Sequence, residues 1–380
     1  MRAETVAAAT VAGATVALAG GGTAGHVNPG LEVARMLRAH GLRVFWLGTH
    51  GALEARLVRA AGIEFHALPA GKLRRYASLR NVTDIGRTGA GVLGAVRILR
   101  RERAGVLFAK GGFASVPPAA AAALLGIPVV THESDSTAGL ATRIISLVAR
   151  RVLLSWPSSS ATLPLPARAR LTGLPVRTEM RAGDPGRGRR YLGVGDRTRI
   201  MLVVGGSLGA ATLNHMVGEA RAELARDWMV VHQTGGQNGG QAVDDPGYRA
   251  QPYFDEEFPD VLAAADVVVS RAGATSLAEF AATGTAAVLV PLPRSSSRGE
   301  QIVNARLLAD AGAALVLQPG AQTASGLVRC ARRLADDRLR ARMSAAIRSL
   351  DRPGATAEVV RHTLRAAGLA LPGLQYRITE

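Results

Sequence analysis

The chain has 380 residues, of which 48% are hydrophobic and 20% are charged. At roughly 100–200 residues per domain this length predicts two domains, and the apolar content excludes a disordered polyelectrolyte. The 46 Lys and Arg residues against 29 acids give a net charge of +17. Such an excess favours a nucleic acid, an anionic membrane or a phosphorylated substrate as partner. The basic residues do not gather in one tail, and no zinc knuckle or aromatic-rich RNA motif occurs, so charge alone leaves all three open.

The single cysteine and the start of the chain bear on its compartment. Cys330 has no partner for an intramolecular disulfide, which fits a reducing cytosol. Val6–Ala19 is mostly apolar and follows Arg2, as in a weak secretory signal, but cleavage near Ala19 would remove a strand that leads into a glycine loop. We therefore expect this segment to be retained. No run reaches the ~20 uninterrupted apolar residues of a membrane-spanning helix.

Strand and helix patterns alternate along the first half of the chain. An Ala-rich helix is expected after Ala109, and the other expected elements are helices at Leu31–His40 and Leu53–Ala61 and strands at Val16–Ala19, Val44–Leu47, Val106–Ala109 and Val129–Thr131. Short apolar runs separated by helical patterns are typical of parallel sheets that helices cover on both faces.

The pattern restarts after an Arg-, Gly- and Asp-rich segment without periodicity, which predicts a linker. Further strands are expected at Ile200–Val204, Met229–Gln233, Val267–Ser270 and Ala287–Val290, and Ala321–Ala367 reads as helical. The sequence thus predicts two doubly wound α/β domains with a cleft between them: residues 1–178, a linker at 179–199, and residues 200–380 with the terminal helices. Ligands of such folds bind where glycine loops join strand ends to helices.

The first such loop, Gly20–Gly25, follows a strand, precedes a helix and is closed by His26. A glycine loop alone is weak support for any function, because every dinucleotide-binding domain has one. No acid ends the second strand, where Gly48-Thr49-His50 stands, and this counts against a nicotinamide cofactor. His26 can take a proton from a hydroxyl group, since an unperturbed imidazole titrates near neutrality. Capping of the helix or a bond to a backbone carbonyl is the equally acceptable alternative.

Two further strand–glycine–helix junctions occur, at Lys110–Phe113 and at Gly205–Ala210. Each alone can be a tight structural turn. Three in one chain favour a pyrophosphate-bearing donor in one domain and a phosphate-bearing acceptor in the other, since free N–H groups at helix starts bind anions.

Polar side chains follow other strand ends. His132–Asp135 is expected to supply positioning groups at the interdomain face rather than a metal site, because no second ligand cluster has metal spacing. Glu279 can accept two ribose hydroxyls or be a solvated helix residue. Gln301 and Asn304, three residues apart on one helix face, can hold sugar hydroxyls. The chain has no convincing Asp-x-Asp signature, which favours a donor site that needs no metal and no cofactor.

Taken together, these segments resemble the MurG family of peptidoglycan N-acetylglucosaminyltransferases. The resemblance runs in collinear order from about Val16 to Gly312. It rests on Gly20–His26 with Asn28-Pro29, Trp46–Thr49 with Glu54, Gly111–Phe113, Gly126–Val130 with His132-Glu133, Thr172–Arg177, Gly205–Ala210 with Asn214, His232–Gly235, Ala265–Arg271 and Gln301–Ala305. So many ordered matches are far more specific than any single glycine loop.

The resemblance implies a GT-B fold, in which two Rossmann-like parallel-sheet domains face a central cleft. It implies that the amino-terminal domain binds lipid I, that the carboxyl-terminal domain binds UDP-GlcNAc, and that the enzyme adds GlcNAc to the C4 hydroxyl of the muramyl sugar with inversion, forming lipid II. It makes His26 the catalytic base or its close assistant. The implied acceptor-binding residues are Gly22, Gly111, Gly112 and Phe113. The implied donor-binding residues are Thr23, Ala24, Gly25, Asp135, Arg177, Ser207, Asp255, Ala274, Glu279, Gln301 and Asn304.

Within that donor set the resemblance assigns the ribose to Glu279, the phosphates to Ser207 and the GlcNAc hydroxyls to Gln301. Four positions depart from the commonest family pattern: Asp135, Leu208, Asp255 and Glu300. They motivate an alternative, a MurG-like enzyme of secondary metabolism with a different acceptor. A binding protein without activity and a dinucleotide oxidoreductase are the other classes. His26, Glu279 and Gln301 together argue against the first, and the missing ribose acid argues against the second.

The family's lipid acceptor also implies a peripheral protein at the cytoplasmic face of the cell membrane, without nucleic acid as a partner. Basic stretches at Lys72–Arg75 and Arg97–Arg103, with neighbouring Leu and Val residues, are candidates for resting on anionic lipid. A solvated helix face is the alternative reading of both stretches.

Overall fold

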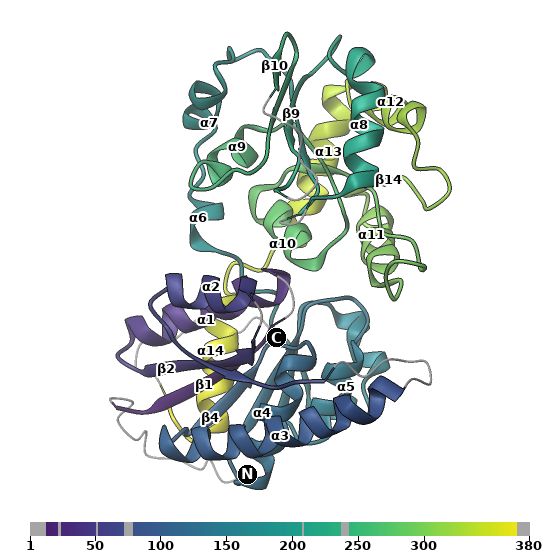
Figure 1. Ribbon diagram of the computed structural model, residues 1–380. Coiled ribbons are helices and arrows are strands. Elements are labelled where there is room, and N and C mark those ends of the chain that lie inside the picture. Colours follow the sequence, from purple (N-terminus) through teal and green to yellow (C-terminus); the bar gives the residue numbers. More distant parts are fainter. Residues whose placement is uncertain are drawn as a thin grey trace. The chain divides into compact units, whose positions relative to one another are not determined.

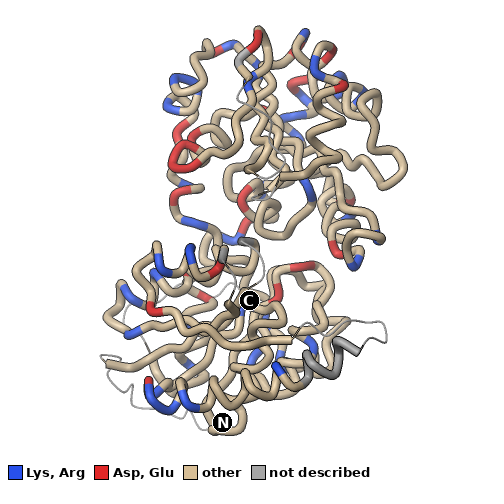
Figure 2. Tube along the Cα trace, in the orientation of Figure 1, with Lys and Arg blue, Asp and Glu red and all other residues tan. Residues whose placement is uncertain are grey.

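The computed structural model describes residues 13–21, 24–50, 52–71, 79–206, 209–236 and 243–370. Its chain divides into two compact units: unit 1 runs to Pro175 and resumes at Arg352, and unit 2 is Val176–Asp351 (Figure 1). Lys and Arg residues are distributed over both units (Figure 2). Among the described residues, no helix is long and apolar enough to cross a membrane.

Unit 1 contains a seven-stranded sheet in the order β3-β2-β1-β4-β5-β6-β7, and every pairing is parallel. Its strands are β1 (Thr15–Ala19), β2 (Arg43–Thr49), β3 (Glu64–Leu68), β4 (Val106–Ala109), β5 (Val129–Glu133), β6 (Arg151–Leu154) and β7 (Ala169–Leu171). Its α-helices are α1 (Ala24–Ala39), α2 (Ala52–Ala60), α3 (Leu79–Arg101), α4 (Val116–Leu124), α5 (Leu140–Ser146) and α14 (Ala355–Ala366). The chain order and the parallel pairing confirm the doubly wound fold for this half.

Alternate residues of the central strands enter two separate cores. Val16 and Leu18 of β1 pack in the core under α1 and α14, whereas Ala17 and Ala19 pack in the core that holds Leu99 of α3. Both faces of the sheet are therefore covered (Figure 1), as a parallel sheet requires. The glycine loop that follows β1 therefore lies at the carboxyl ends of the strands.

Unit 2 contains a second seven-stranded sheet, in the order β10-β11-β9-β8-β12-β13-β14. Its strands are β8 (Ile200–Val204), β9 (Met229–Gln233), β10 (Val243–Asp245), β11 (Tyr248–Gln251), β12 (Val267–Ser270), β13 (Ala286–Leu289) and β14 (Ala314–Val316). Its α-helices are α6 (Thr178–Arg181), α7 (Pro185–Leu192), α8 (Ala211–Leu224), α9 (Phe258–Ala264), α10 (Ala274–Thr283), α11 (Glu300–Asp310), α12 (Ala324–Arg333) and α13 (Asp337–Arg348). The pairings are parallel except at the edge, where β10 and β11 form an antiparallel hairpin.

Two predicted domain boundaries are wrong. Residues 179–199 are not a bare linker, because α6 and α7 lie there and belong to unit 2. The terminal helix α14 does not belong to the second domain, since Val359, Val360 and Leu364 are fully buried in a core of unit 1. The chain therefore passes between the units twice.

Candidate active site

Trp46 of β2 supports the glycine loop that follows β1. The indole Nε1 donates to the carbonyl oxygen of Gly20 at 3.0 Å, and the ring is fully buried. A methyl group on Gly30 of α1 would lie only 2.5 Å from Cη2 of this ring. Because a carbon atom cannot be accommodated there without displacement, Gly30 lets the second turn of α1 pack directly on the indole.

Glu54 of α2 supports the same loop from the side. Its carboxylate is 4% exposed and accepts bonds from the backbone N and, at 2.8 Å, the hydroxyl of Thr49. A methyl group on Gly21 would overlap this carboxylate, and one on Gly48 would lie 2.7 Å from Oε1. The carboxylate of Glu54 thus fills the space beside the loop, a role that its place in the sequence motif does not reveal.

His26 lies in the first turn of α1 and is half-buried. The second glycine pair approaches its ring: methyl groups on Gly111 and Gly112 would lie 3.9 Å from Nδ1 and 3.7 Å from Cδ2. A methyl group on Gly112 would also lie 2.7 Å from the carbonyl oxygen of Gly21. The structure therefore brings together the predicted base and two predicted acceptor-binding residues, which come from adjacent strands β1 and β4.

The second loop depends on glycine conformations. Gly111 and Gly112 have φ of 100° and 76°, in the region that side chains other than glycine rarely adopt. The hydroxyl of buried Ser115 donates to the carbonyl oxygens of Gly111 at 2.8 Å and Ala19 at 3.0 Å, tying the two loops together. Phe113 begins the short 3-10 turn that leads from Gly112 into α4. Gly22 and Thr23 lie outside the described residues, and Ala24 and Gly25 begin α1.

Lys110 precedes this loop and is buried. Its Nζ donates to the hydroxyl of Ser134 at 2.5 Å, and burial lowers its pKa to about 8, against the opposing charges of Glu133 and Asp135. Lys110 is thus a buried cation beside the second glycine loop, and it links β4 to the segment after β5. In the sequence, Lys110 stands out only as the first residue of the glycine motif.

The structure corrects the interpretation of His132 and Glu133 as positioning groups at the domain surface. His132 is fully buried and its Nε2 contacts the carbonyl oxygen of Gly173 at 2.9 Å, while burial holds its pKa well below the usual range. The carboxylate of Glu133 accepts from the backbone N of Asp135 at 3.0 Å and of Gly139 at 2.9 Å. Glu133 therefore stabilises the turn after β5, whereas His132 joins β5 to the segment after β7. Asp135 is the half-buried residue that remains a candidate.

In unit 2, half-buried Arg177 and buried Glu279 form an ion pair. The guanidinium Nε and Nη2 donate to Oε1 of Glu279 at 3.1 and 2.8 Å. The cation also lies 5.9 Å from the ring centre of Phe258. Glu279 is 6% exposed, and burial raises the pKa of its carboxyl, partly offset by Arg177. The alternative of a solvated helix carboxylate is therefore wrong.

The two amides of α11 differ in their surroundings. Oε1 of Gln301 accepts from the backbone N of Leu292 at 3.2 Å, and within the described residues its Nε2 makes no hydrogen bond. Asn304 is 1% exposed, and its Nδ2 donates to the carbonyl oxygen of Ala272 at 3.1 Å. Gln301 keeps a donor for a ligand, whereas the amide of Asn304 ties α11 to the loop after β12.

The remaining predicted donor residues lie at the carboxyl ends of the same sheet. Ala274 is the buried first residue of α10, directly after β12, and Asp255 is exposed and follows β11. Ser207 and Leu208 lie outside the described residues, but the flanking Gly206 and Gly209 have φ of 88° and 78°. The backbone N of Gly209 donates to the carbonyl oxygen of Gly206 at 3.0 Å, so these two glycines form a turn shortly before α8 begins.

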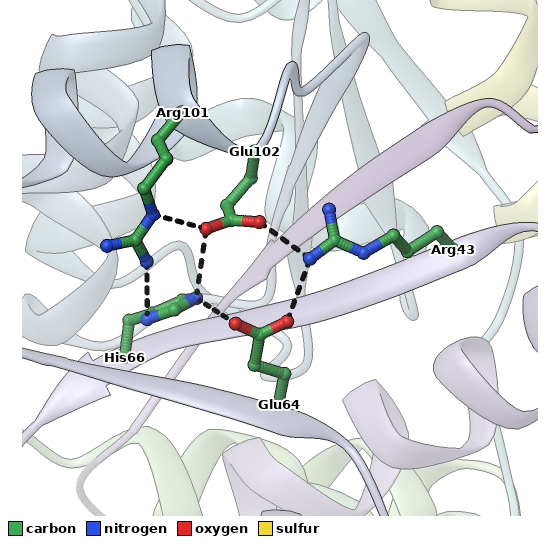
Figure 3. Close-up of polar contacts among 5 residues, drawn as sticks. All are labelled: Arg43, Glu64, His66, Arg101 and Glu102. Carbon is green, nitrogen blue, oxygen red and sulfur yellow. Dashed lines mark hydrogen bonds and ion pairs between the residues drawn. The ribbon is translucent and has the colours of Figure 1, made fainter.

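A polar cluster at the opposite end of the strands of unit 1 has the composition of a metal site. Oxygens of Glu64 and Glu102 and Nε2 of His66 lie within 4.8 Å of one another. However, Nη2 of Arg43 donates to both carboxylates, at 2.9 and 2.6 Å, and Nε of Arg101 donates to Glu102 at 2.6 Å (Figure 3). Two arginines balance two carboxylates, so we interpret the cluster as an ion-pair network between β2, β3 and the end of α3.

Comparison with known proteins agrees with this arrangement. Residues 16–154 match the glycosyltransferase family 28 N-terminal domain, and residues 200–357 match the C-terminal domain of the same family. A protein of Treponema denticola is 40% identical over 78% of this chain and 82% of its own length, and one of Treponema pallidum is 42% identical over 79% and 81%. Both are named UDP-N-acetylglucosamine--N-acetylmuramyl-(pentapeptide) pyrophosphoryl-undecaprenol N-acetylglucosamine transferase.

A solved structure gives the same assignment. The crystal structure of Acinetobacter baumannii MurG superposes with a TM-score of 0.74 at 30% identity, covering 93% of this chain and 99% of that one. Fold and sequence agree over both units, which confirms the expected GT-B fold. The chain belongs to the MurG family of glycosyltransferase family 28.

Proposed function

We propose that this protein transfers GlcNAc from UDP-GlcNAc to the C4 hydroxyl of the MurNAc of lipid I, forming lipid II. The observation that carries the proposal is the position of His26 against Gly111 and Gly112 in a chain of this family. The curated relatives bear the name of this activity, so secondary metabolism is not favoured. We assign acceptor binding to unit 1 and donor binding to unit 2.

The chemistry is one in-line displacement at the anomeric carbon. The acceptor O4 forms a bond to C1 of GlcNAc while the bond from C1 to the β-phosphate oxygen of UDP breaks, and its electron pair leaves with UDP. His26 removes the proton from O4, so that the nucleophile gains charge as the leaving group departs. Inversion follows from the single displacement, and precise placement of the two substrates supplies much of the rate.

We assign the donor contacts as follows. Glu279 accepts from the ribose hydroxyls while Arg177 holds its other oxygen, and the free amide nitrogen of Gln301 donates to a GlcNAc hydroxyl. The start of α8, with Ser207, faces the pyrophosphate, because unpaired N–H groups at a helix start stabilise negative charge. Asp255 and Ala274 lie beside the uracil and the sugar, and Asn304 acts by holding the loop after β12.

We assign binding of the acceptor mainly to glycines and other small residues of unit 1. The backbones of Gly22, Gly111 and Gly112, with Phe113, receive the lipid pyrophosphate and muramyl sugar. Thr23, Ala24 and Gly25 lie between this group and the transferred GlcNAc, and Asp135 contacts the donor sugar. Each of these contacts comes from the family resemblance, and the glycine geometry of Gly111 and Gly112 supports it.

We also propose that unit 1 rests on an anionic membrane surface at the cytoplasmic face. Helices α3, α4 and α5 pack together on one face of its sheet. They and the following turn expose Leu93, Leu124 and Leu147 at 60%, 74% and 55%. Exposed Arg97 lies one helical turn beyond Leu93, and at about 1 kcal/mol per basic residue a few such cations hold a protein at a membrane reversibly. The stretch Lys72–Arg75 lies outside the described residues.

An acceptor panel tests the proposed reaction. The protein is incubated with UDP-GlcNAc and either a soluble lipid I analogue, a muramyl glycoside without pyrophosphate, or aromatic glycosides and aglycones. We expect a product heavier by one GlcNAc residue, linked β to C4, only with the lipid I analogue. Efficient transfer to an aglycone in place of lipid I would instead establish the secondary-metabolism alternative.

A further inference from the structure

Three hydrogen-bonded polar side chains, buried Tyr248 and His232 and half-buried Asn214, lie beside the glycine turn before α8. Oη of Tyr248 lies 2.8 Å from Nδ1 of His232, and Nε2 of His232 lies 3.1 Å from Oδ1 of Asn214. Nδ2 of Asn214 in turn donates to the carbonyl oxygen of Thr234 at 2.8 Å. His232 is 1% exposed and Tyr248 is 7% exposed, so the bond between them is shielded from water, and the two bonds of Asn214 are partly buried.

The chemistry of the four groups allows one arrangement of protons. The carbonyl of Thr234 only accepts, so the amide nitrogen of Asn214 faces it and Oδ1 faces His232. His232 therefore carries its proton on Nε2, and its bare Nδ1 accepts the hydroxyl proton of Tyr248. Burial lowers the pKa of His232 to about 4, so the imidazole is neutral at neutral pH. Each hydrogen bond in this series, which we call the relay, therefore keeps the donor and acceptor just given.

The far end of this relay meets the predicted donor loop. A methyl group on Gly209 would lie 2.5 Å from the carbonyl oxygen of Thr234 and 3.2 Å from Cα of Gly235. The carbonyl that Asn214 holds is thus the one packed against the glycine turn. Asn214 itself is in the first turn of α8, where its backbone N donates to Ala210 at 2.8 Å. The relay joins the end of β9 to the start of α8.

We propose that Tyr248 and His232 are positioning residues for the donor: through Asn214 they set the place of the glycine turn and the α8 start that bind the UDP pyrophosphate. This inference rests on the proposed donor site. Neither side chain contacts the donor, so their loss acts on UDP affinity and on KM rather than on the chemical step. Tyr248→Phe removes only the hydroxyl and leaves Nδ1 of His232 buried without a donor, which costs about as much as one lost hydrogen bond.

The test compares UDP dissociation constants by calorimetry, and KM and kcat, for the whole protein and three variants. Tyr248→Phe is expected to weaken UDP binding and raise the KM for UDP-GlcNAc about 3- to 10-fold, with kcat within 2-fold. Asn214→Leu, which breaks both of its bonds, is expected to have a larger effect in the same direction. Tyr191→Phe is the matched control, because within the described part of the chain its hydroxyl donates only to the side chain of Gln251.

A second readout works on the protein without ligand. Nitrogen-15 spectra of the histidines are expected to show His232 as the neutral Nε2–H tautomer at pH 7, and this signature is expected to shift in Tyr248→Phe. Wild-type affinity for UDP in Tyr248→Phe, with binding by the wild type intact, overturns the inference alone. Failure of the wild type to bind UDP overturns the donor assignment itself, whatever the tautomer is.

Discussion

Arg177 directs Nε and Nη2 at the same oxygen, Oε1 of Glu279. Within the described residues no hydrogen bond reaches Oε2, so one oxygen is held by the protein and the other is left for a ligand. The two residues are 102 positions apart in the sequence. A buried carboxylate with one oxygen fixed in this way is a suitable acceptor for the two hydroxyls of a ribose.

Glu279→Gln is the first prediction from this pair. The amide keeps an oxygen for Arg177 but places an NH₂ group where the ribose hydroxyls need an acceptor. We expect roughly 10- to 100-fold weaker binding of UDP, as for the loss of hydrogen bonds to a charged group. Calorimetry with UDP and 2′-deoxy-UDP measures this. The wild type should discriminate between the two ligands and the variant should not, and equal discrimination by both proteins would contradict the role of Glu279.

Glu219→Gln is the matched control for this prediction, because Glu219 is an exposed carboxylate on α8. It removes the same charge from the same unit without touching the pair. We expect it to bind both ligands as the wild type does.

Gly30→Ala tests the support of the first glycine loop. The added methyl group collides with Trp46, and overpacking of this kind costs about 1–3 kcal/mol of stability. Gly89→Ala in α3 is the control, since nothing lies within 4 Å of its added methyl group and Ala favours a helix over Gly by about 1 kcal/mol. Calorimetric melting should show a lower Tm for the first variant and an unchanged or higher Tm for the second. A Gly30→Ala protein as stable as the wild type would mean that α1 does not depend on this contact.

The depressed pKa of His232 predicts acid sensitivity. In the folded protein burial lowers this pKa to about 4 from the ordinary 6.5, so between these values only the unfolded chain binds the proton. Stability is therefore lost as pH falls from about 6.5 to 4, by at most roughly 3 kcal/mol. Urea unfolding at several pH values should give a shallower pH dependence over this range for His232→Gln than for the wild type. Identical slopes would show that His232 is not held neutral by the fold.

The membrane assignment predicts a specific loss of vesicle binding. Leu124→Ser combined with Leu147→Ser removes two exposed apolar side chains from the α4–α5 region without disturbing the core. We expect several-fold weaker sedimentation with phosphatidylglycerol vesicles, and binding of the wild type that declines as salt rises. Val303→Ser, an exposed site in unit 2, should bind like the wild type. If the double variant also binds vesicles like the wild type, a different surface of the protein contacts the membrane.

Much of the fold was predictable because central parallel strands are continuous apolar runs. Ile200–Val204 and Val267–Ser270 were predicted with the bounds they have, and both are buried along their whole length. The edge strand β7 was not predicted, because two of its three residues are exposed and it has no continuous apolar run. Helix α7 escaped for a different reason: its Arg-rich sequence lacks apolar periodicity, and it packs on α9 through Gly188, where an added methyl group would overlap the backbone of Asp260.

In the candidate site, too, some residues could be predicted from the sequence and others could not. Local motifs located His26, Gly111 and Gly112, because a glycine turn between a strand and a helix is visible in the sequence. Partners distant in sequence were not visible: nothing local indicates that Glu54 lies beside Gly21, or that α14 returns to the first unit. These relations depend on packing rather than on periodicity.

The most direct test of the central claim is transfer of labelled GlcNAc from UDP-GlcNAc to a lipid I analogue by the wild type and by His26→Ala. We predict transfer by the wild type, and a kcat lower by about 100- to 10,000-fold in the variant with its UDP affinity unchanged, as for the loss of a general base. A wild type that binds UDP-GlcNAc but does not transfer to lipid I would contradict the assigned reaction. Undiminished transfer by His26→Ala would contradict the role of His26.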